Sequence, residues 1–147
     1  MPRRNVLFKS NSFNTTEQKE YFINPGCFGD DLARWLTQRL RDRGIPTEAE
    51  PGQEDFGWYL RFRIAETEHN LVIVFRPDDI GSSGKGDWLC VLERRAGFAA
   101  SLFGGRKKGI TAEAPRILHE ILQAAPEISE IRWFSNEEGE DSAQPQP

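Results

Sequence analysis

The sequence predicts an α+β domain in which two amphipathic helices bracket an antiparallel sheet of about four to five strands. Two observations lead to this class: single helical patterns flank a strand-rich middle, and the strands there do not alternate with helices. The expected order is α-β-β-β-(β)-α-β. The chain lacks a βαβ phosphate fingerprint, which argues against a Rossmann fold.

The first expected helix spans about Asp30 to Arg43. Asp30 or Asp31 is placed to cap its free N–H groups, and Gly44 to end it in the left-handed conformation. Its apolar residues recur at spacings of three and four, which predicts one buried face. These residues are Leu32, Trp35, Leu36 and Leu40.

A strand-rich middle follows. Apolar and polar residues alternate from Trp58 to Ala65, which is typical of a half-buried antiparallel strand. The polar run 66–70 predicts a turn, and it contains His69. The nearly continuous apolar run Leu71–Arg76 predicts the central strand, and Trp88–Glu93 the next one. The stretch from Ala96 to Gly109 fits a strand or a short helix equally well.

The second expected helix runs from about Ala112 to Gln123, with Thr111 as its cap and Pro126 beyond its end. Its buried face is predicted to contain Ala114, Ile117, Leu118, Ile121 and Leu122. A last short strand is expected over Ile128–Phe134.

Length and composition place one domain at 1–135. The 147 residues are 37% hydrophobic and 29% charged, as in ordinary globular proteins. Residues 1–20 supply one short strand or stay loose, and the acidic segment 136–147 is expected to be disordered.

No run approaches about 18 apolar residues, so no membrane partner is expected. The N-terminus shows no apolar leader, which favours the cytoplasm and reduced thiols at Cys27 and Cys90.

Two sequence segments stand out: Cys27-Phe-Gly-Asp-Asp-Leu-Ala-Arg-Trp-Leu36 and Gln53-Glu-Asp-Phe-Gly-Trp-Tyr-Leu60. Together they resemble a small family of uncharacterised bacterial proteins. The resemblance covers about 18 residues and the helix–strand order around them. It implies a bacterial origin and no particular mechanism.

Two acids and three aromatics meet where the first long strand begins. Glu54, Asp55, Trp58 and Tyr59 are therefore candidate binding residues for another protein, with aromatic contact area and steering carboxylates. The alternative is that Trp58 and Phe56 belong to the core and that the acids form a solvated turn.

Basic residues suggest a second candidate site, for nucleic acid or a phosphate ligand. Arg61 and Arg63, with Arg76 and Arg94, form a cationic sheet face if they point the same way. The glycine-rich loop 104–111 contains Arg106, Lys107 and Lys108 and precedes a helix, as anion sites do. Its outline approaches a P-loop, but isoleucine occupies position 110 where that motif needs lysine. The net charge of −4 argues against a general nucleic-acid binder. The alternative for the sheet face is that helix acids or the acidic tail neutralise it, and the alternative for the loop is a solvated basic turn.

The residues give less support to a catalytic function. Cys27 would need His69 or His119 as a base, and Glu54 and Asp55 point to opposite faces of an extended chain. The spacings of the cysteines and histidines match no metal motif, so neither metal nor cofactor is expected. The sequence favours a non-enzymatic protein-interaction module of regulatory or immunity type; a nucleic-acid or phosphate binder and a small enzyme are the alternatives.

Overall fold

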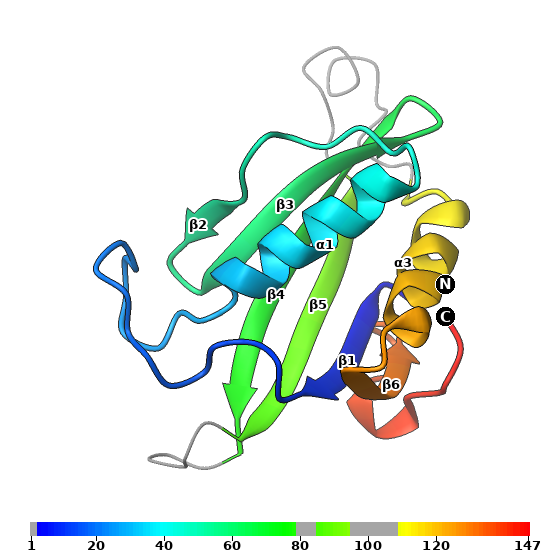
Figure 1. Ribbon diagram of the computed structural model, residues 1–147. Coiled ribbons are helices and arrows are strands. Elements are labelled where there is room, and N and C mark those ends of the chain that lie inside the picture. Colours follow the sequence, from blue (N-terminus) through cyan, green and yellow to red (C-terminus); the bar gives the residue numbers. More distant parts are fainter. Residues whose placement is uncertain (1–2, 79–84, 95–108) are drawn as a thin grey trace.

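The computed structural model describes residues 3–78, 85–94 and 109–147. Within them, six strands form one antiparallel sheet with two α-helices on one of its faces (Figure 1). The elements are β1 (Asn5–Ser10), α1 (Asp30–Asp42), β2 (Gly52–Glu54), β3 (Gly57–Ile64), β4 (Thr67–Pro77), β5 (Gly86–Arg94), α3 (Glu113–Ala124), β6 (Ile128–Phe134) and the 3₁₀ turn η2 (Glu140–Ser142). The sheet order is β2-β3-β4-β5-β1-β6.

The α+β class is confirmed, whereas the expected strand number was too small and the expected order lacked its first strand. The N-terminal segment supplies β1, which pairs with both β5 and β6 inside the sheet. Its residues Val6, Leu7 and Phe8 are all fully buried, as expected for a strand with a neighbour on each side. The short edge strand β2 has only three residues, too few to show a period in the sequence.

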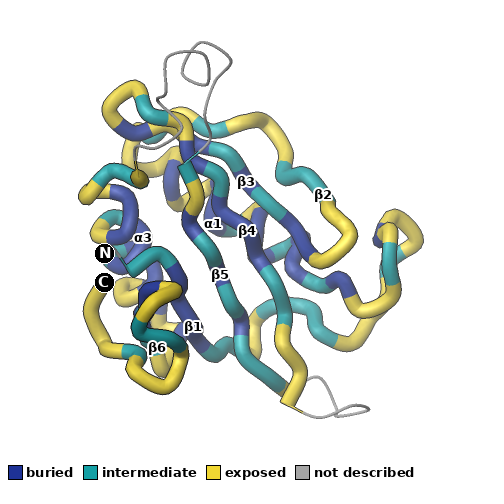
Figure 2. The backbone as a smooth tube through the Cα atoms, turned by 180° about the vertical axis from the view of Figure 1, so that it is seen from behind, coloured by how far each residue is buried: buried dark blue, intermediate teal, exposed yellow. Residues whose placement is uncertain are grey.

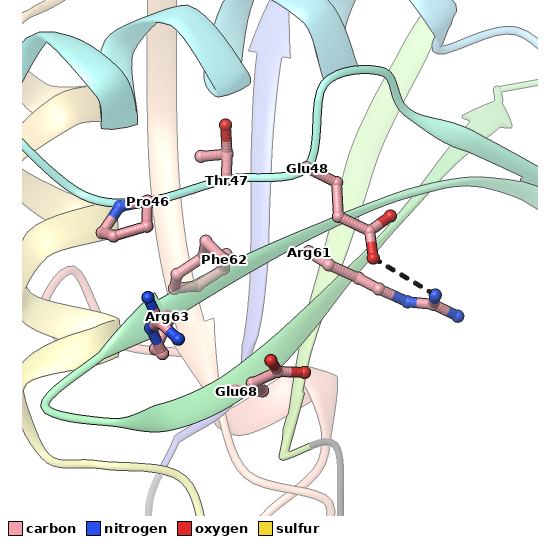
Figure 3. A pocket seen from close by; sticks show the side chains of 7 residues that line it. All are labelled: Pro46, Thr47, Glu48, Arg61, Phe62, Arg63 and Glu68. Carbon is pink, nitrogen blue, oxygen red and sulfur yellow. Dashed lines mark hydrogen bonds and ion pairs between the residues drawn. The ribbon is translucent and has the colours of Figure 1, made fainter. Parts of the chain in front are cut away.

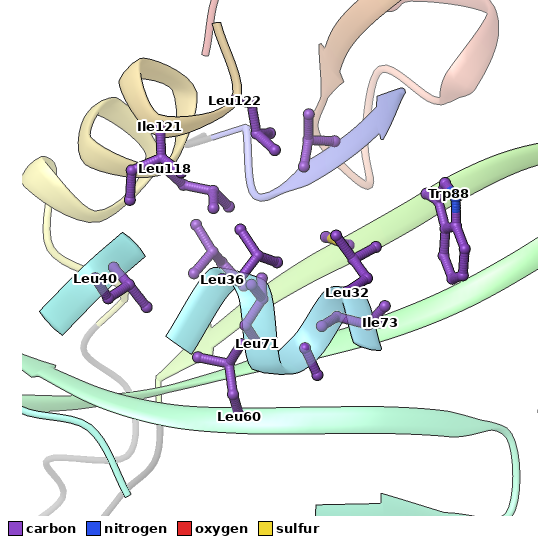
Figure 4. Close-up of a cluster of buried hydrophobic side chains, with 14 of the residues drawn as sticks. Leu32, Leu36, Leu40, Leu60, Leu71, Ile73, Trp88, Leu118, Ile121 and Leu122 are labelled. Atoms are coloured by element: carbon purple, nitrogen blue, oxygen red, sulfur yellow. The ribbon is translucent and has the colours of Figure 1, made fainter. Parts of the chain in front are cut away.

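The core lies between the helices and the sheet. Leu36 of α1 and Leu122 of α3 are fully buried, and burying one such side chain contributes about 1.5–3 kcal/mol. Figure 4 shows α1, α3 and the sheet meeting in one apolar cluster. Its labelled members are Leu32, Leu36, Leu40, Leu60, Leu71, Ile73, Trp88, Leu118, Ile121 and Leu122. The predicted buried faces of both helices therefore hold, although Trp35 and Ile117 are only partly buried.

The ends of α1 follow the prediction in part. Gly44 has φ 77° and ends the helix in the left-handed region as expected. At the other end, Gly29 precedes the helix and no side chain caps it. The Asp31 carboxylate instead accepts hydrogen bonds from the backbone N–H groups of Asn14 (2.7 Å) and Leu32 (2.9 Å). Asp31 thus fastens the N-terminal segment to the helix.

Gly29 is predicted to be sensitive to substitution. Its φ of 131° disfavours any side chain, and a Cβ there would lie 3.2 Å from Ile73 Cγ2. We expect Gly29→Ala to lower the free energy of unfolding by about 1–3 kcal/mol, as backbone strain of this kind does. Urea denaturation measures the loss. Gly109→Ala is the control, because nothing lies within 4 Å of a Cβ there; equal losses in both variants would contradict the prediction.

Residues 136–147, the acidic segment that composition predicts to be disordered, contact the sheet and the N-terminal segment in the structure. Glu138 pairs with Arg3 at 2.8 Å, and both outer nitrogens of Arg76 contact the Glu140 carboxylate. Gln144 forms a bridge with Trp133 at the β6 edge. Composition shows an acidic run, but it does not show which arginines pair with it.

Candidate functional site

The face of the sheet opposite α1 and α3 carries the candidate site. Figure 2 shows this side, with β3, β4 and β5 across the middle and the described helices behind them. Residues that alternate with the core positions point to this side, and we call the set the open face. In the three middle strands it consists of Tyr59, Arg61, Arg63, Glu68, Asn70, Val72, Val74, Arg76, Asp87, Leu89, Val91 and Glu93.

The centre of the open face is aliphatic. Val72 pairs with Val91 across β4 and β5, and Val74 pairs with Leu89. Three of these four side chains are half-buried, and Val72 is 9% exposed. The outer face of a one-sided antiparallel sheet is normally polar. An aliphatic patch there indicates contact with something other than water.

The β2–β3 turn borders this patch. A cavity of about 350 Å³, here named the face cavity, lies between the turn and the two strands. Its lining residues are Glu54, Phe56, Asn70, Val72, Val74, Val91 and Glu93. A Cβ at Gly57 would lie 2.3 Å from the Ile73 carbonyl oxygen, so only glycine permits this close approach of β3 to β4. Phe56, next to Gly57, is 58% exposed.

Arg61 lies next to the face cavity but turns away from it. Its guanidinium carbon lies 4.9 Å from the centre of the Tyr59 ring, and its NH1 lies 3.4 Å from Glu48 Oε1. Figure 3 shows this pair at a second, smaller cavity of about 180 Å³ at the sheet edge. That edge cavity is lined by Pro46, Thr47, Glu48, Arg61, Phe62, Arg63 and Glu68. Its two arginines and two glutamates balance one another, so it offers no net charge to a ligand.

The opposite end of the open face has its charges paired. Asp87 lies between Lys9 (2.9 Å) and Arg132 (3.5 Å), and Arg76 contacts Glu140. By contrast, neither Glu54 nor Glu93 forms an ion pair or hydrogen bond with any residue that the structure describes. Within the described ranges, the face cavity therefore has two carboxylates on its rim without a cationic partner.

The structure brings together most of the described residues that the sequence selected. Glu54 and Asp55 are exposed in the turn, and Tyr59, Arg61 and Arg63 share the open face. Trp58 lies on the helix side, is 5% exposed, and donates its indole N–H to the Cys27 carbonyl (2.7 Å). It supports the site from the core rather than facing a partner. The loop residues Arg106, Lys107 and Lys108 lie outside the described ranges.

The four strand arginines do not form one cationic face. Arg61, Arg63 and Arg76 point outward, whereas Arg94 pairs in register with His69, whose ring is buried on the helix side. Acids interleave with the outward three. Glu68 pairs in register with Arg63, and Asp87 with Arg76.

The groups considered for catalysis lie apart from this site or are engaged. Cys27 is buried, with its Sγ 3.4 Å from the Asp55 carbonyl oxygen. Burial raises the pKa of the Cys90 thiol far above its usual range. Tyr21 donates its hydroxyl to Asp30, which raises the pKa of Tyr21. In the described ranges, no three His, Cys, Asp or Glu side chains gather as a metal site.

A larger hollow, of about 630 Å³, lies between the start of α3 and the C-terminal segment. Its cations already have partners: Arg3 pairs with Glu138, and Arg116 with Glu120. This hollow therefore lacks the uncompensated charge that distinguishes the face cavity.

Sequence reasoning missed several lining residues. Asn70 was assigned to a turn, Val72 and Val74 to a strand without a stated face, and Glu93 to the end of a strand. Phe56 was seen in the aromatic cluster but was not selected. The alternation of Asn70, Val72, Val74 and Arg76 was the available signal, and the continuous apolar run hid it.

The fold and site define an α+β domain with helices on one face of an antiparallel sheet and a partly aliphatic, charge-rimmed face on the other. Neither a protein-family model, nor a curated protein, nor a solved structure matches the chain. Within the described residues, no helix has the length and apolar character needed to span a membrane.

Proposed function

We propose that the chain is a non-enzymatic protein-interaction module, regulatory or immunity-type in kind, that binds another protein through its open face. The observation that carries the proposal is the aliphatic patch of Val72, Val74, Leu89 and Val91, bordered by the exposed ring of Phe56. Protein interfaces combine an apolar, aromatic-rich centre with a polar rim. The open face has this arrangement, with Arg61 and Glu93 at one end and Arg76 and Asp87 at the other.

The charge distribution favours a protein over a nucleic acid as the partner. A nucleic-acid site concentrates unpaired cations. On the open face, Arg61 and Arg76 are already paired with glutamates, and Glu54 and Glu93 would repel phosphates. Filter binding with mixed RNA and DNA at low salt tests the alternative. Salt-sensitive retention there would overturn this proposal.

Substitution of Val74 tests the proposed surface. Val74→Asp places a carboxylate in the centre of the patch, whereas Ala124→Asp makes a similar change at an exposed position at the end of α3, on the helix side. Partners captured from the source cells are identified by mass spectrometry, purified, and titrated calorimetrically. We expect Val74→Asp to weaken binding at least about tenfold, equivalent to about 1.4 kcal/mol, and Ala124→Asp to leave it unchanged.

The result that contradicts the proposal is a purified partner that binds the Val74→Asp variant as tightly as the parent chain. Failure to find any partner whose binding depends on the open face would also contradict the proposal. Circular dichroism of the variant confirms that it is folded before either conclusion is drawn.

A further inference from the structure

The residues that line the face cavity suit a narrower class of ligand than the rest of the open face does. Its floor is formed by Val72, Val74 and Val91 from two paired strands. Its walls are Phe56 and Glu54 on the side of the β2–β3 turn and Glu93 on the side of β5. A volume of about 350 Å³ is at the lower end for small-ligand sites, and it suits one long side chain.

Among the described residues that line the cavity, the only charged groups are the carboxylates of Glu54 and Glu93. Glu54 and Glu93 are exposed, and neither has a partner in the part of the chain that the structure describes. Arg61, the nearest cation in register, is held toward the sheet edge by Glu48 and Tyr59. Asn70 lies in the same row as Arg61 and Glu93, and its buried side-chain oxygen Oδ1 accepts no hydrogen bond from a described residue. A cationic group entering the cavity would find carboxylate and amide acceptors, and none of the described lining residues is a cation.

Resting on the proposed function, we infer that the face cavity receives an arginine side chain of the partner protein. The methylene stem of arginine packs on the valine floor, as long cationic side chains do on apolar surface. Its planar guanidinium meets the carboxylates of Glu54 and Glu93 and the exposed ring of Phe56. Carboxylate pairing and aromatic stacking are both preferred by guanidinium over the compact lysine ammonium. The partner is thus a protein that presents an exposed arginine on a surface complementary to the aliphatic patch.

The inference is tested with a small probe, Nα-acetyl-L-arginine N-methylamide. Methyl NMR spectra of the full chain report on the floor through Val72, Val74 and Val91. The norleucine analogue keeps an apolar stem without charge, and the lysine analogue replaces the guanidinium by an ammonium. We expect the arginine probe to shift the floor methyls and to bind at least about fivefold more tightly than either analogue. Added salt should weaken its binding, because the rim carboxylates are exposed.

Two double variants with equal charge changes locate the interaction. Glu54→Gln/Glu93→Gln removes both rim carboxylates, and we expect at least a fivefold loss of arginine binding. Glu113→Gln/Glu137→Gln removes two exposed acids outside the cavity lining and should leave binding unchanged. Equal binding of the arginine and norleucine probes, tighter binding of the lysine probe, or absence of methyl shifts would each overturn the inference.

Titration of the purified partner separates this inference from the proposed function. If Val74→Asp abolishes partner binding while the Glu54→Gln/Glu93→Gln variant binds normally, the open face is the interface but the arginine assignment is wrong. If neither change affects partner binding, the proposed function fails as well.

Discussion

Replacing Trp88 with alanine is expected to lower the free energy of unfolding by about 3–5 kcal/mol, the usual range for a fully buried tryptophan. Trp88 is completely buried on the helix side of β5. Its ring centre lies 5.0 Å from that of Phe75 and 6.3 Å from that of Phe13. Truncation leaves a cavity between the sheet and the N-terminal segment, because neighbours held in register by β4 and β5 have little room to collapse. Urea denaturation followed by circular dichroism measures the loss.

Phe56→Ala is the matched control for this prediction. Phe56 is 58% exposed in the β2–β3 turn, so removing its ring costs little burial. We expect a change within about 0.5 kcal/mol, as for ordinary surface positions. Losses of similar size in the two variants would show that Trp88 does not anchor the core. The Phe56 variant also serves the binding experiments, since it changes a cavity wall without changing the fold.

The second large expected effect is a loss of stability as the pH falls below about 6.5, the ordinary pKa of histidine. Both histidines are buried and accept hydrogen bonds as neutral rings. His69 Nε2 accepts from the Thr111 N–H (3.2 Å), and His119 Nδ1 accepts from the Trp133 indole N–H (3.0 Å). Burial lowers the pKa of both side chains in the folded chain. Protonation would place a hydrogen on a nitrogen that already faces a donor.

The direction in which stability changes with pH follows from proton linkage. The unfolded chain takes up protons at its histidines near the ordinary pKa of about 6.5, before the folded chain does. Stability is therefore fully present above that value and falls as the pH drops below it, until the lowered pKa values of the folded state are reached. Each histidine contributes a slope of at most about 1.4 kcal/mol per pH unit, so the two together reach at most about 2.7.

Urea denaturation at pH 7.5, 6.5 and 5.5 measures this slope. His119→Gln is the informative variant, because the glutamine oxygen still accepts from Trp133 but does not titrate. We expect its stability to fall less steeply than that of the parent chain below pH 6.5. If the slope of this variant equals that of the parent chain, His119 does not carry the effect.

The helices were predictable because their signals are local. The spacing of Leu32, Leu36 and Leu40 gives α1 one apolar face at any tertiary position, and Gly44 ends the helix through its own backbone freedom. The outward alternation of Tyr59, Arg61 and Arg63 was likewise visible in β3. For the same reason, the sequence could single out Tyr59, Arg61 and Arg63 as one outward row.

His69 shows where local reasoning failed. The polar run 66–70 indicated a turn, but the structure turns at Ala65 and Glu66, whose φ values are 50° and 66°. Left-handed backbone at two residues other than glycine is uncommon and leaves no sequence signal. The earlier turn places His69 within β4, where it is buried and stacks on Phe62. The same shift moves Asn70 from the expected turn to the wall of the face cavity.

Local patterns were enough to predict the α+β class, the two helices with their buried faces, and three strands between Trp58 and Glu93. The tertiary structure alone decided that β1 lies inside the sheet, that distant arginines pair with the C-terminal acids, and that Glu54, Phe56 and Glu93 surround one cavity. The physical reason is the range of the interactions. Helix faces and strand alternation depend on residues a few positions apart, whereas strand order and charge pairing depend on contacts between segments that only folding brings together.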